Sequence, residues 1–253
     1  MNEPQEIANN LYSFYDVFRS VLPTYSGKNQ QFSWVKNKQG FWPNMVYAVQ
    51  NKEKELSELT NQLSDKLPPF WVVNNDENGV ETGVFLKNNG LREINQWSGM
   101  VLTKDMLKPT TKVNTQIVIK KITTIAELSA WVEVLNQELF SGQQTEKELF
   151  EKVFTNQQFN FYGAYFNDEL VATLLSFHSE KSCGLYLIAT KKSFRKQGIA
   201  TNLVQHSIHD AFEIGKSNIV LQASKAGENV YKNLGFEKYG TFSVYWKLEI
   251  RDF

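Results

Sequence analysis

Several residue types are scarce in this chain of 253 residues, and each scarcity excludes a class of protein. The one cysteine, Cys183, excludes a disulfide within the chain and a zinc site built on several thiolates. The three histidines, His178, His206 and His209, argue against a metal site with several imidazole ligands. His206 and His209 are three residues apart on an expected helix, but exposed histidines are common on helices. We therefore expect no metal.

Long apolar runs and an excess of one charge are also missing. No run reaches the ~18–20 apolar residues that a membrane helix needs. The polar start MNEPQEIANN lacks the basic and apolar regions of a signal peptide. We therefore expect a cytoplasmic protein with no membrane partner. Lys plus Arg and Asp plus Glu number 27 each, so the formal net charge is zero, which argues against a nucleic-acid partner.

Proline is absent from more than half of the chain. All six prolines lie at or before Pro109, and the polar segment Lys108–Lys112 separates two apolar stretches. Hydrophobic residues at 42% and charged residues at 21% are typical of a folded chain, whose length suits one large domain or two ordinary ones. We place a linker there and predict two domains, residues 1–112 and residues 113–253.

The second half has the clearer pattern of strands and helices. Alternating apolar residues predict strands, and apolar residues three and four apart predict helices. Thr123 or Thr124 is the expected N-cap of the first helix, a capping box is expected at Thr145–Glu148, and Gly235 is expected to end the last helix. Asn218–Ala223 is nearly all apolar, which favours a central, parallel strand. The expected strands are Gln116–Ile122, Phe159–Phe166, Leu170–Phe177, Gly184–Thr190, Asn218–Ala223, Phe236–Phe242 and Ser243–Ile250, and the expected helices are Ile125–Phe140, a short helix through Phe154, Gly198–Ile214 and Gly227–Leu234.

The first half repeats the order of elements that runs from Gly184 to the end. In both halves a short helix ends at a glycine, Gly90 or Gly235, and a strand follows on an apolar residue. We interpret this as a diverged internal duplication, the alternative being chance recurrence of a common helix–glycine–strand pattern. The expected elements are the strand Met45–Val49, the helix Lys52–Lys66, the strand Phe70–Val73, the helix Thr82–Asn89 and strand pieces in Leu91–Leu102.

The most informative stretch is Leu185–Ala200, where an apolar strand leads through a loop into a helix that begins near Gly198. Small residues at 198 and 200 let a ligand approach the backbone closely. The first amides of a helix have no partner within it, and with the helix dipole they form a site suited to a pyrophosphate. Four basic side chains add positive charge: Lys191, Lys192, Arg195 and Lys196. Taken alone, the short pattern is also compatible with an ordinary helix start among surface lysines.

The surrounding sequence makes the pattern more specific. The motif R-x-x-G-x-A at residues 195–200 is followed by a second apolar strand and then by Y-x-x-x-G-F at residues 231–236. This combination, with the order of elements from Gln116 to Ile250, resembles the GNAT superfamily of N-acetyltransferases. The resemblance implies an α/β (α+β) fold with a mixed, mostly antiparallel sheet flanked by helices. It also implies a parallel strand pair that splays apart in the C-terminal domain.

The resemblance also implies roles for particular residues. Acetyl-CoA, the acyl donor, would place its pyrophosphate on the loop amides and its pantetheine arm along the strand Ile188–Thr190, where an amide near Ile188–Ala189 would stabilise the oxyanion. Tyr231 would protonate the departing thiolate, with packing on the last strands as the alternative. The implied cofactor-binding residues are Ile188, Ala189, Thr190, Arg195, Lys196, Gln197, Gly198, Ile199, Ala200 and Ser224.

The chain departs from the family pattern at two positions and leaves the general base open. Many members have Asn where Ser224 stands and Ala where Gly227 stands, which puts the role of Ser224 in doubt. The attacking amine must lose a proton, and the side chains near the expected cleft are His178, Glu180 and Tyr186. A charge in an ordinary turn is the alternative reading of Glu180.

The first half lacks the features of a cofactor site. After Met45–Val49 no glycine or other small residue follows, and Glu53 and Glu55 would repel a phosphate at the helix start. Its aromatic segments resemble those of two-domain members, in which a degenerate first domain packs beside an active second one. We expect the first half to shape the acceptor cleft, with at least two of its tryptophans in the core. These tryptophans are Trp34, Trp42, Trp71 and Trp97.

These observations favour an enzyme that transfers an acyl group, most simply acetyl, from acyl-CoA to an amine by direct attack in a ternary complex. The alternatives are a non-catalytic CoA-binding regulatory module and a protein-interaction domain with an aromatic docking face. The acceptor, a small-molecule amine or a peptide, and the state, a monomer or a homodimer, stay open.

Overall fold

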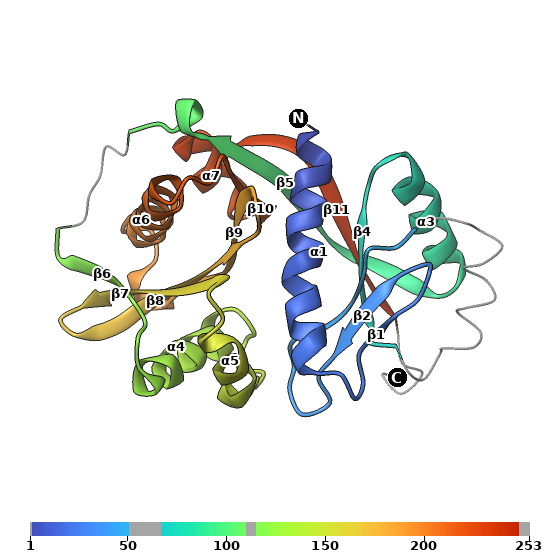
Figure 1. The fold of residues 1–253 in the computed structure, drawn as a ribbon, viewed down its shortest axis with the longest axis horizontal. Coiled ribbons are helices and arrows are strands. Elements are labelled where there is room, and N and C mark those ends of the chain that lie inside the picture. Colours follow the sequence, from blue (N-terminus) through green and yellow to red (C-terminus); the bar gives the residue numbers. More distant parts are fainter. Residues whose placement is uncertain (1, 51–66, 110–114, 248–253) are drawn as a thin grey trace.

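One continuous, mostly antiparallel sheet of eleven strands forms the centre of the described structure, a computed structural model that describes residues 2–50, 67–109 and 115–247. Helices cover both faces of this sheet (Figure 1). The order of strands across the sheet is β1-β2-β3-β4-β11-β5-β10-β9-β8-β7-β6.

The described elements come in the following order along the chain. The strands are β1 (Gly27–Lys28), β2 (Ser33–Lys36), β3 (Asn44–Tyr47), β4 (Phe70–Asn74), β5 (Leu91–Thr103), β6 (Ile117–Lys121), β7 (Phe159–Phe166), β8 (Glu169–His178), β9 (Ser182–Thr190), β10 (Asn218–Ser224) and β11 (Glu237–Lys247). The helices are α1 (Glu3–Val21), α3 (Glu77–Asn88), α4 (Ile125–Glu138), α5 (Lys147–Phe154), α6 (Ile199–Glu213) and α7 (Glu228–Leu234), with the 3-10 turns η1 (Lys104–Met106) and η2 (Lys192–Phe194). The expected helix Lys52–Lys66 and most of the expected linker lie outside the described residues.

The two halves of the chain exchange their last strands at the centre of the sheet. β5 and β11 pair with each other; β11 also pairs with β4 of the first half, and β5 with β10 of the second. The outer neighbours of β4 and β10 are parallel to them, which gives the two parallel pairs β3–β4 and β9–β10. Outward from the β5–β11 pair, each side of the sheet therefore has an antiparallel pairing, then a parallel pairing, then antiparallel pairings. This symmetry supports the interpretation of an internal duplication, while the domain boundary at residue 112 stays a prediction.

The expected strand positions are largely confirmed, with corrections at the centre of the sheet. The pieces expected in Leu91–Leu102 form one strand, β5, and the two strands expected at the end form one strand, β11, up to Lys247. Both strands have a partner on each side, so the two bulges, one at Tyr239 of β11 and one at Ile94 of β5, do not end their pairing. β10 is central and parallel to β9, as expected.

Two of the three expected helix caps are confirmed, Thr124 of α4 and Gly235 of α7, and the third is wrong. Thr124 caps α4, and its hydroxyl and the carboxylate of Glu127 form a capping box. No such box opens α5, where Glu146 is the N-cap without a side-chain hydrogen bond. Instead, the Thr145 hydroxyl accepts a hydrogen bond from the amide of Trp42 at 3.1 Å. Thr145 thus links the α4–α5 loop to the first half of the chain.

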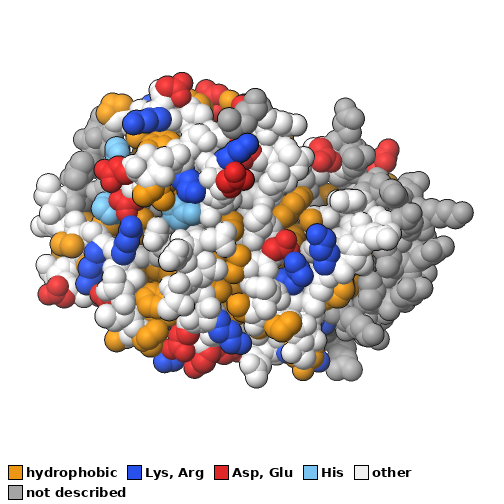
Figure 2. Space-filling view, in the orientation of Figure 1, with side chains coloured by type: hydrophobic (Ala, Val, Ile, Leu, Met, Phe, Trp, Pro, Cys, Tyr) orange, Lys and Arg blue, Asp and Glu red, His pale blue; other side chains and the backbone are white. Residues whose placement is uncertain are grey.

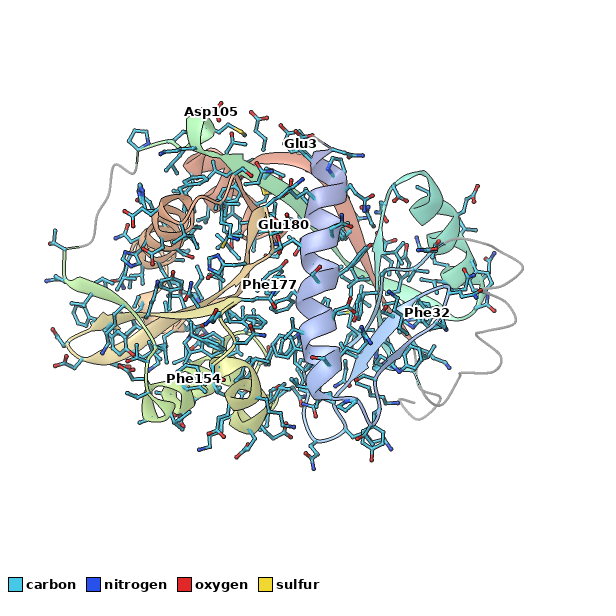
Figure 3. The ribbon with its side chains drawn as sticks, viewed as in Figure 1. Glu3, Phe32, Asp105, Phe154, Phe177 and Glu180 are labelled. Atoms are coloured by element: carbon cyan, nitrogen blue, oxygen red, sulfur yellow. The ribbon has the colours of Figure 1, made fainter. Side chains whose placement is uncertain are left out.

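Helix α1, which the sequence analysis did not predict, crosses the middle of the molecule between the two halves (Figure 1). Pro4 stands in its first turn, Asn2 caps it, and its apolar residues recur three and four apart. Its buried side chains share one core with α4, α5 and strands of both halves, and Phe177 of β8 lies between its strand and this helix (Figure 3). The buried apolar and aromatic side chains of α1 are Ile7, Ala8, Leu11, Phe14, Tyr15 and Phe18.

Two further cores complete the packing. Leu203, Val204 and Ile208 of α6 pack with α7 on the sheet strands around β8 to β10. Leu86 of α3 packs with Trp71 in the third core. Trp71 and Trp42 are buried, so the expectation of two core tryptophans is confirmed. Among the side chains drawn in colour, Figure 2 shows acidic and basic groups mixed over the visible face, with no extended region of one sign.

Candidate active site

The two parallel strands of the second half separate at their carboxyl ends. β9 and β10 pair over only three positions, the last of which joins Val220 to Gly184. β9 then continues to Thr190 and β10 to Ser224 without further pairing between them. β10 keeps its other partner, β5, up to Ser224. The separation exposes the backbone of β9 on the side that faces β10, as the family resemblance implied.

A β-bulge in β9 lies beside this separation. Leu187 has a positive φ of 50°, and the register between β8 and β9 shifts between Thr173 and Leu175. A bulge turns backbone groups out of the regular ladder. The hydroxyl of Thr173 donates to the Leu187 carbonyl at 3.3 Å and so satisfies one of these groups. The amides near Ile188–Ala189, expected to stabilise an oxyanion, follow the bulge directly; their role stays a prediction.

The loop after β9 has the backbone form expected of an anion site. Lys196 and Gly198 both have positive φ, 62° and 79°, which turns successive amides toward one concavity. The first regular hydrogen bond of α6 runs from the Asn202 amide to the Gly198 carbonyl at 3.0 Å. The amides of Ile199 and Ala200 therefore lie at the open, positive end of the helix.

Two of the four basic side chains in this loop are already ion-paired. Lys191 Nζ lies 2.7 Å from the Glu169 carboxylate. Arg195 Nη2 lies 2.8 Å from the Glu138 carboxylate, and its Nε donates to the Thr190 carbonyl. The remaining two, Lys192 and Lys196, are exposed, and Gln197 hydrogen-bonds within the loop. The backbone amides are thus the main feature of the loop that suits a pyrophosphate.

A cleft of about 500 Å³ begins where β9 and β10 separate. Ile188 of β9, Ser224 of β10 and Tyr231 of α7 all line it, so the structure brings these three expected site residues together. Ala189 and Thr190 lie at the end of the same strand, between the cleft and the anion loop. The Ser224 hydroxyl accepts from the Gly227 amide at 3.3 Å and is accordingly tied to the start of α7.

Tyr231 is held in its protonated form. Its ring packs edge-on against Phe236 at 5.8 Å, so it also has the packing role considered as the alternative. Burial raises the pKa of Tyr231 to about 12. A phenol with this pKa carries its proton at neutral pH and has the form of a proton donor.

Of the three candidates for a general base, only Tyr186 lines the cleft. His178 binds Asn160 and Ser176 and lies toward Lys216; burial, with that charge, lowers its pKa to about 4. Glu180 is exposed in the turn between β8 and β9 (Figure 3). The Tyr186 hydroxyl donates to Asn10 Oδ1 at 2.6 Å, and burial raises the pKa of Tyr186 well above its usual value.

The opposite wall of the cleft comes from residues that sequence reasoning did not assign to the site. Phe14 of α1 stacks on Tyr186 with ring centroids 4.0 Å apart, and Tyr15 lies beside it. Trp42 and Trp97 come from the loop before β3 and from β5. The helical spacing of apolar residues in 3–21 could have revealed α1. The pairing of β5 with β10, which brings Trp97 opposite Ser224, has no signal in the sequence.

One polar group in the cleft lacks a partner. Gln222 of β10 lines the cleft. Its buried Nε2 makes no direct hydrogen bond among the described residues, although the amide lies close enough to the Tyr186 hydroxyl to oppose the rise in the pKa of that group. A buried donor without an acceptor is costly and points to an acceptor supplied by a ligand. Gln222 lies two positions beyond Val220, the last residue of β10 that pairs with β9, so it stands where these two strands have already separated.

Comparison with known proteins agrees with this geometry. A family model described as "Acetyltransferase (GNAT) domain" matches residues 122–243. Residues 122–243 therefore form a GNAT acetyltransferase domain. The matched segment contains the anion loop, β9, β10 and Tyr231, whereas α1 and the loop that carries Trp42 lie outside it.

Solved structures match the GNAT fold over most of the chain. A GCN5-related N-acetyltransferase from Kribbella flavida matches with a TM-score of 0.67 at 12% identity, covering 92% of this chain and 95% of that one. A GCN5-related N-acetyltransferase from Sphaerobacter thermophilus matches with a TM-score of 0.64 at 15% identity, covering 90% of this chain and 84% of that one. These coverages extend the structural likeness to the first half.

In the part of the chain that the structure describes, no group of three or more His, Cys, Asp or Glu side chains is arranged to hold a metal ion. None of the helices within residues 2–50, 67–109 and 115–247 is long and apolar enough to cross a membrane.

Proposed function

We propose that this GNAT protein is an acyl-CoA-dependent N-acyltransferase, most simply an N-acetyltransferase. It moves acetyl from acetyl-CoA to a primary amine by direct attack within a ternary complex. The observation that carries the proposal is the continuity of three features along β9: the anion loop at its end, its unpaired edge beside β10, and the cleft containing Tyr231.

Each feature suits one part of the acyl donor. The amides at residues 196–200 suit the pyrophosphate, and the free edge of β9 at Ile188–Thr190 suits the amide groups of the pantetheine arm. The thioester then enters the cleft near Tyr231. The unpartnered Nε2 of Gln222 supplies a donor for a carbonyl oxygen in this region.

The reaction requires one bond to form and one to break. The amine nitrogen attacks the thioester carbonyl, the C–S bond breaks, and the nitrogen loses a proton while the sulfur gains one. Tyr231 is placed to give the sulfur its proton. Because a free thiol has a pKa near ~8.5, the help from Tyr231 is modest.

A second candidate function, a non-catalytic CoA-binding module, is favoured by one observation. Among the described residues that line the cleft there is no carboxylate and no imidazole to act as a base. A protein-interaction role is favoured by the exposed apolar rim of the same cleft, formed by Phe41, Ile94 and Leu139.

A thiol-release assay distinguishes these functions. The purified protein is incubated with acetyl-CoA alone and with each member of a panel of amines, and CoA binding is measured separately by calorimetry. The proposed transferase releases thiol only when an amine is present. Tight CoA binding without thiol release for any amine supports the regulatory module, and the absence of CoA binding contradicts both.

Three expectations accompany the proposed function and stay predictions. The first is the division into a degenerate first domain, residues 1–112, and an active second domain, residues 113–253. The second is a cytoplasmic location without nucleic-acid or membrane partners. The third is a monomeric or homodimeric state.

A further inference from the structure

The described residues that line the cleft carry no charged side chain. They are apolar, aromatic or neutral polar, and none is Asp, Glu, Lys, Arg or His. The three tyrosines that face it, Tyr15, Tyr186 and Tyr231, have pKa values raised by burial and stay neutral.

Two carboxylates on elements that line the cleft are paired with other side chains. On α7, Glu228 binds the Ser98 hydroxyl at 2.7 Å and Lys232 at 2.5 Å. On β5, Glu93 pairs with Lys87 at 2.7 Å. These carboxylates are therefore neutralised by partners outside the lining of the cleft.

An uncharged cleft discriminates among amines by their charge. Moving an ammonium group from water into surroundings without a counter-charge is costly, whereas a neutral amine loses far less on entry. Desolvation also shifts a bound amine toward its neutral, nucleophilic form. A polycation would have to lose water around several charges at once and would find no carboxylate in the lining.

Aromatic side chains give the cleft its shape. The ring centroids of Trp42 and Phe140 are 6.2 Å apart in a stacked arrangement, and those of Phe41 and Phe140 are 5.4 Å apart, so the three rings pack on one another. Phe41 is 38% exposed, and Ile94 at the rim is 50% exposed. A planar, apolar acceptor can therefore contact rings inside the cleft and extend over an apolar rim.

We infer that the acceptor is a weakly basic, ring-bearing primary amine that enters the cleft uncharged, as an arylamine does, and that no side chain of the protein serves as the general base. This inference rests on the proposed function. The atoms balance without a base: a neutral amine carries two N–H protons, and the one lost on forming the amide equals the one gained by the sulfur when the C–S bond breaks. An ammonium substrate would have to give up a further proton first.

The first test measures kcat/KM for three amines of graded charge. The probes are an arylamine, which is neutral at pH 7, an aralkylamine of similar size, which is a monocation, and an aminoglycoside, which is a polycation. We expect the order arylamine, aralkylamine, aminoglycoside. Higher activity on the aminoglycoside would overturn the inference while leaving the transferase function in place.

The pH dependence of kcat/KM shows whether the titrating group belongs to the amine or to the protein. Between about pH 6 and about pH 8, kcat/KM for the arylamine is expected to stay flat. For the aralkylamine it is expected to rise about tenfold per pH unit, following the neutral fraction of that amine. A fall in the arylamine rate toward acid pH would reveal a protein base and contradict the inference.

A charge placed at the rim should reverse the preference. Ile94 is the unpaired residue of a bulge in β5, because Glu93 and Asn95 pair with adjacent residues of β11. Ile94→Glu therefore adds a carboxylate beside the cleft without removing a sheet hydrogen bond. Ile94→Gln is the matched control, and Val118→Glu places the same charge on the exposed face of β6, away from the cleft.

The ratio of kcat/KM for the aralkylamine to that for the arylamine is expected to rise about fivefold in Ile94→Glu. It should stay unchanged in Ile94→Gln and Val118→Glu. An unchanged ratio in Ile94→Glu, with CoA binding intact by calorimetry, would contradict the inference. If the wild-type protein binds no CoA, the proposed function fails and the inference fails with it.

Discussion

Replacing Gly198 tests the pyrophosphate assignment most sharply. Gly198 precedes α6 with a φ of 79° and ψ of 0°, a left-handed conformation that glycine adopts without a steric penalty. Gly198→Glu places a carboxylate at the open end of α6, where the amides of Ile199 and Ala200 are available. The new carboxylate competes for these amides and repels the phosphates. Gly198→Ala shares the backbone change without the charge and is the matched control.

The expected loss of CoA affinity follows from the hydrogen bonds that Gly198→Glu removes. Losing two hydrogen bonds between amides and a charged phosphate costs about 3–6 kcal/mol, so CoA affinity should fall at least ~100-fold in Gly198→Glu. A side chain in the left-handed region costs about 1–2 kcal/mol of stability, which both variants share. For a chain of this size the melting temperature should fall by about 2–8 °C in each.

Calorimetric titration with CoA and thermal denaturation by circular dichroism measure the two effects. We expect a large loss of CoA affinity in Gly198→Glu and a much smaller one in Gly198→Ala, with similar melting temperatures. Equal CoA affinity in Gly198→Glu and the wild type would show that the pyrophosphate binds elsewhere. An equal loss of CoA affinity in both variants would show that the effect comes from the backbone conformation and not from the charge.

Three further predictions follow from buried groups. Asn10→Leu removes the acceptor of the Tyr186 hydroxyl and should lower the unfolding free energy by about 1–3 kcal/mol in urea titrations, against a change within about 0.5 kcal/mol for the exposed Asn9→Leu. Tyr231→Phe should lower kcat about tenfold or more with little change in KM for acetyl-CoA, and equal kcat would remove its acid role. Because the pKa of His178 falls from 6.5 to about 4 in the folded state, the unfolded chain binds the extra proton, and stability should fall by up to about 3 kcal/mol as the pH drops from 6.5 to 4. His178→Gln should flatten this slope, and an unchanged slope would contradict the burial of a neutral imidazole.

The sequence contained enough local information to locate the elements around the loop at 191–198. Strand β9, the loop at 191–198 and helix α6 lie where apolar periodicity and the motif at 195–200 predicted them. This succeeded because each element is defined by contacts with its neighbours in sequence. The positive φ of Gly198 likewise agrees with the role assigned to a small residue there.

The exchange of β5 and β11 could not be predicted, because it depends on contacts between distant residues. Trp97 pairs with both Phe242 and Ser224, far away in the chain, and nothing in the alternation of β5 indicates those partners. A strand paired on both sides tolerates polar residues and glycine that would otherwise indicate breaks. This is why β5 and β11 were expected as separate pieces.

The acceptor wall was missed for two different reasons. Helix α1 was not predicted, although it has a regular apolar stripe, because polar residues are interspersed among its buried positions such as Phe14 and Phe18. The position of Trp42 depends on the bond from its amide to Thr145, a contact between the two halves. The same contact explains why Thr145 does not cap α5. The sequence analysis expected the aromatic first half to shape the acceptor cleft, but the uncharged lining was not visible until both halves were placed.

The most direct measurement of the central claim follows the acetyl group itself. The protein is incubated with an arylamine and acetyl-CoA whose acetyl group carries a heavy isotope, and mass spectrometry quantifies the amine product while free thiol is measured in parallel. We predict one labelled acetyl amide for each thiol released, with the label on the primary amine. Thiol release without an acetylated amine, or labelled acetyl found as free acetate, would contradict the claim that this protein transfers acetyl from acetyl-CoA to an amine.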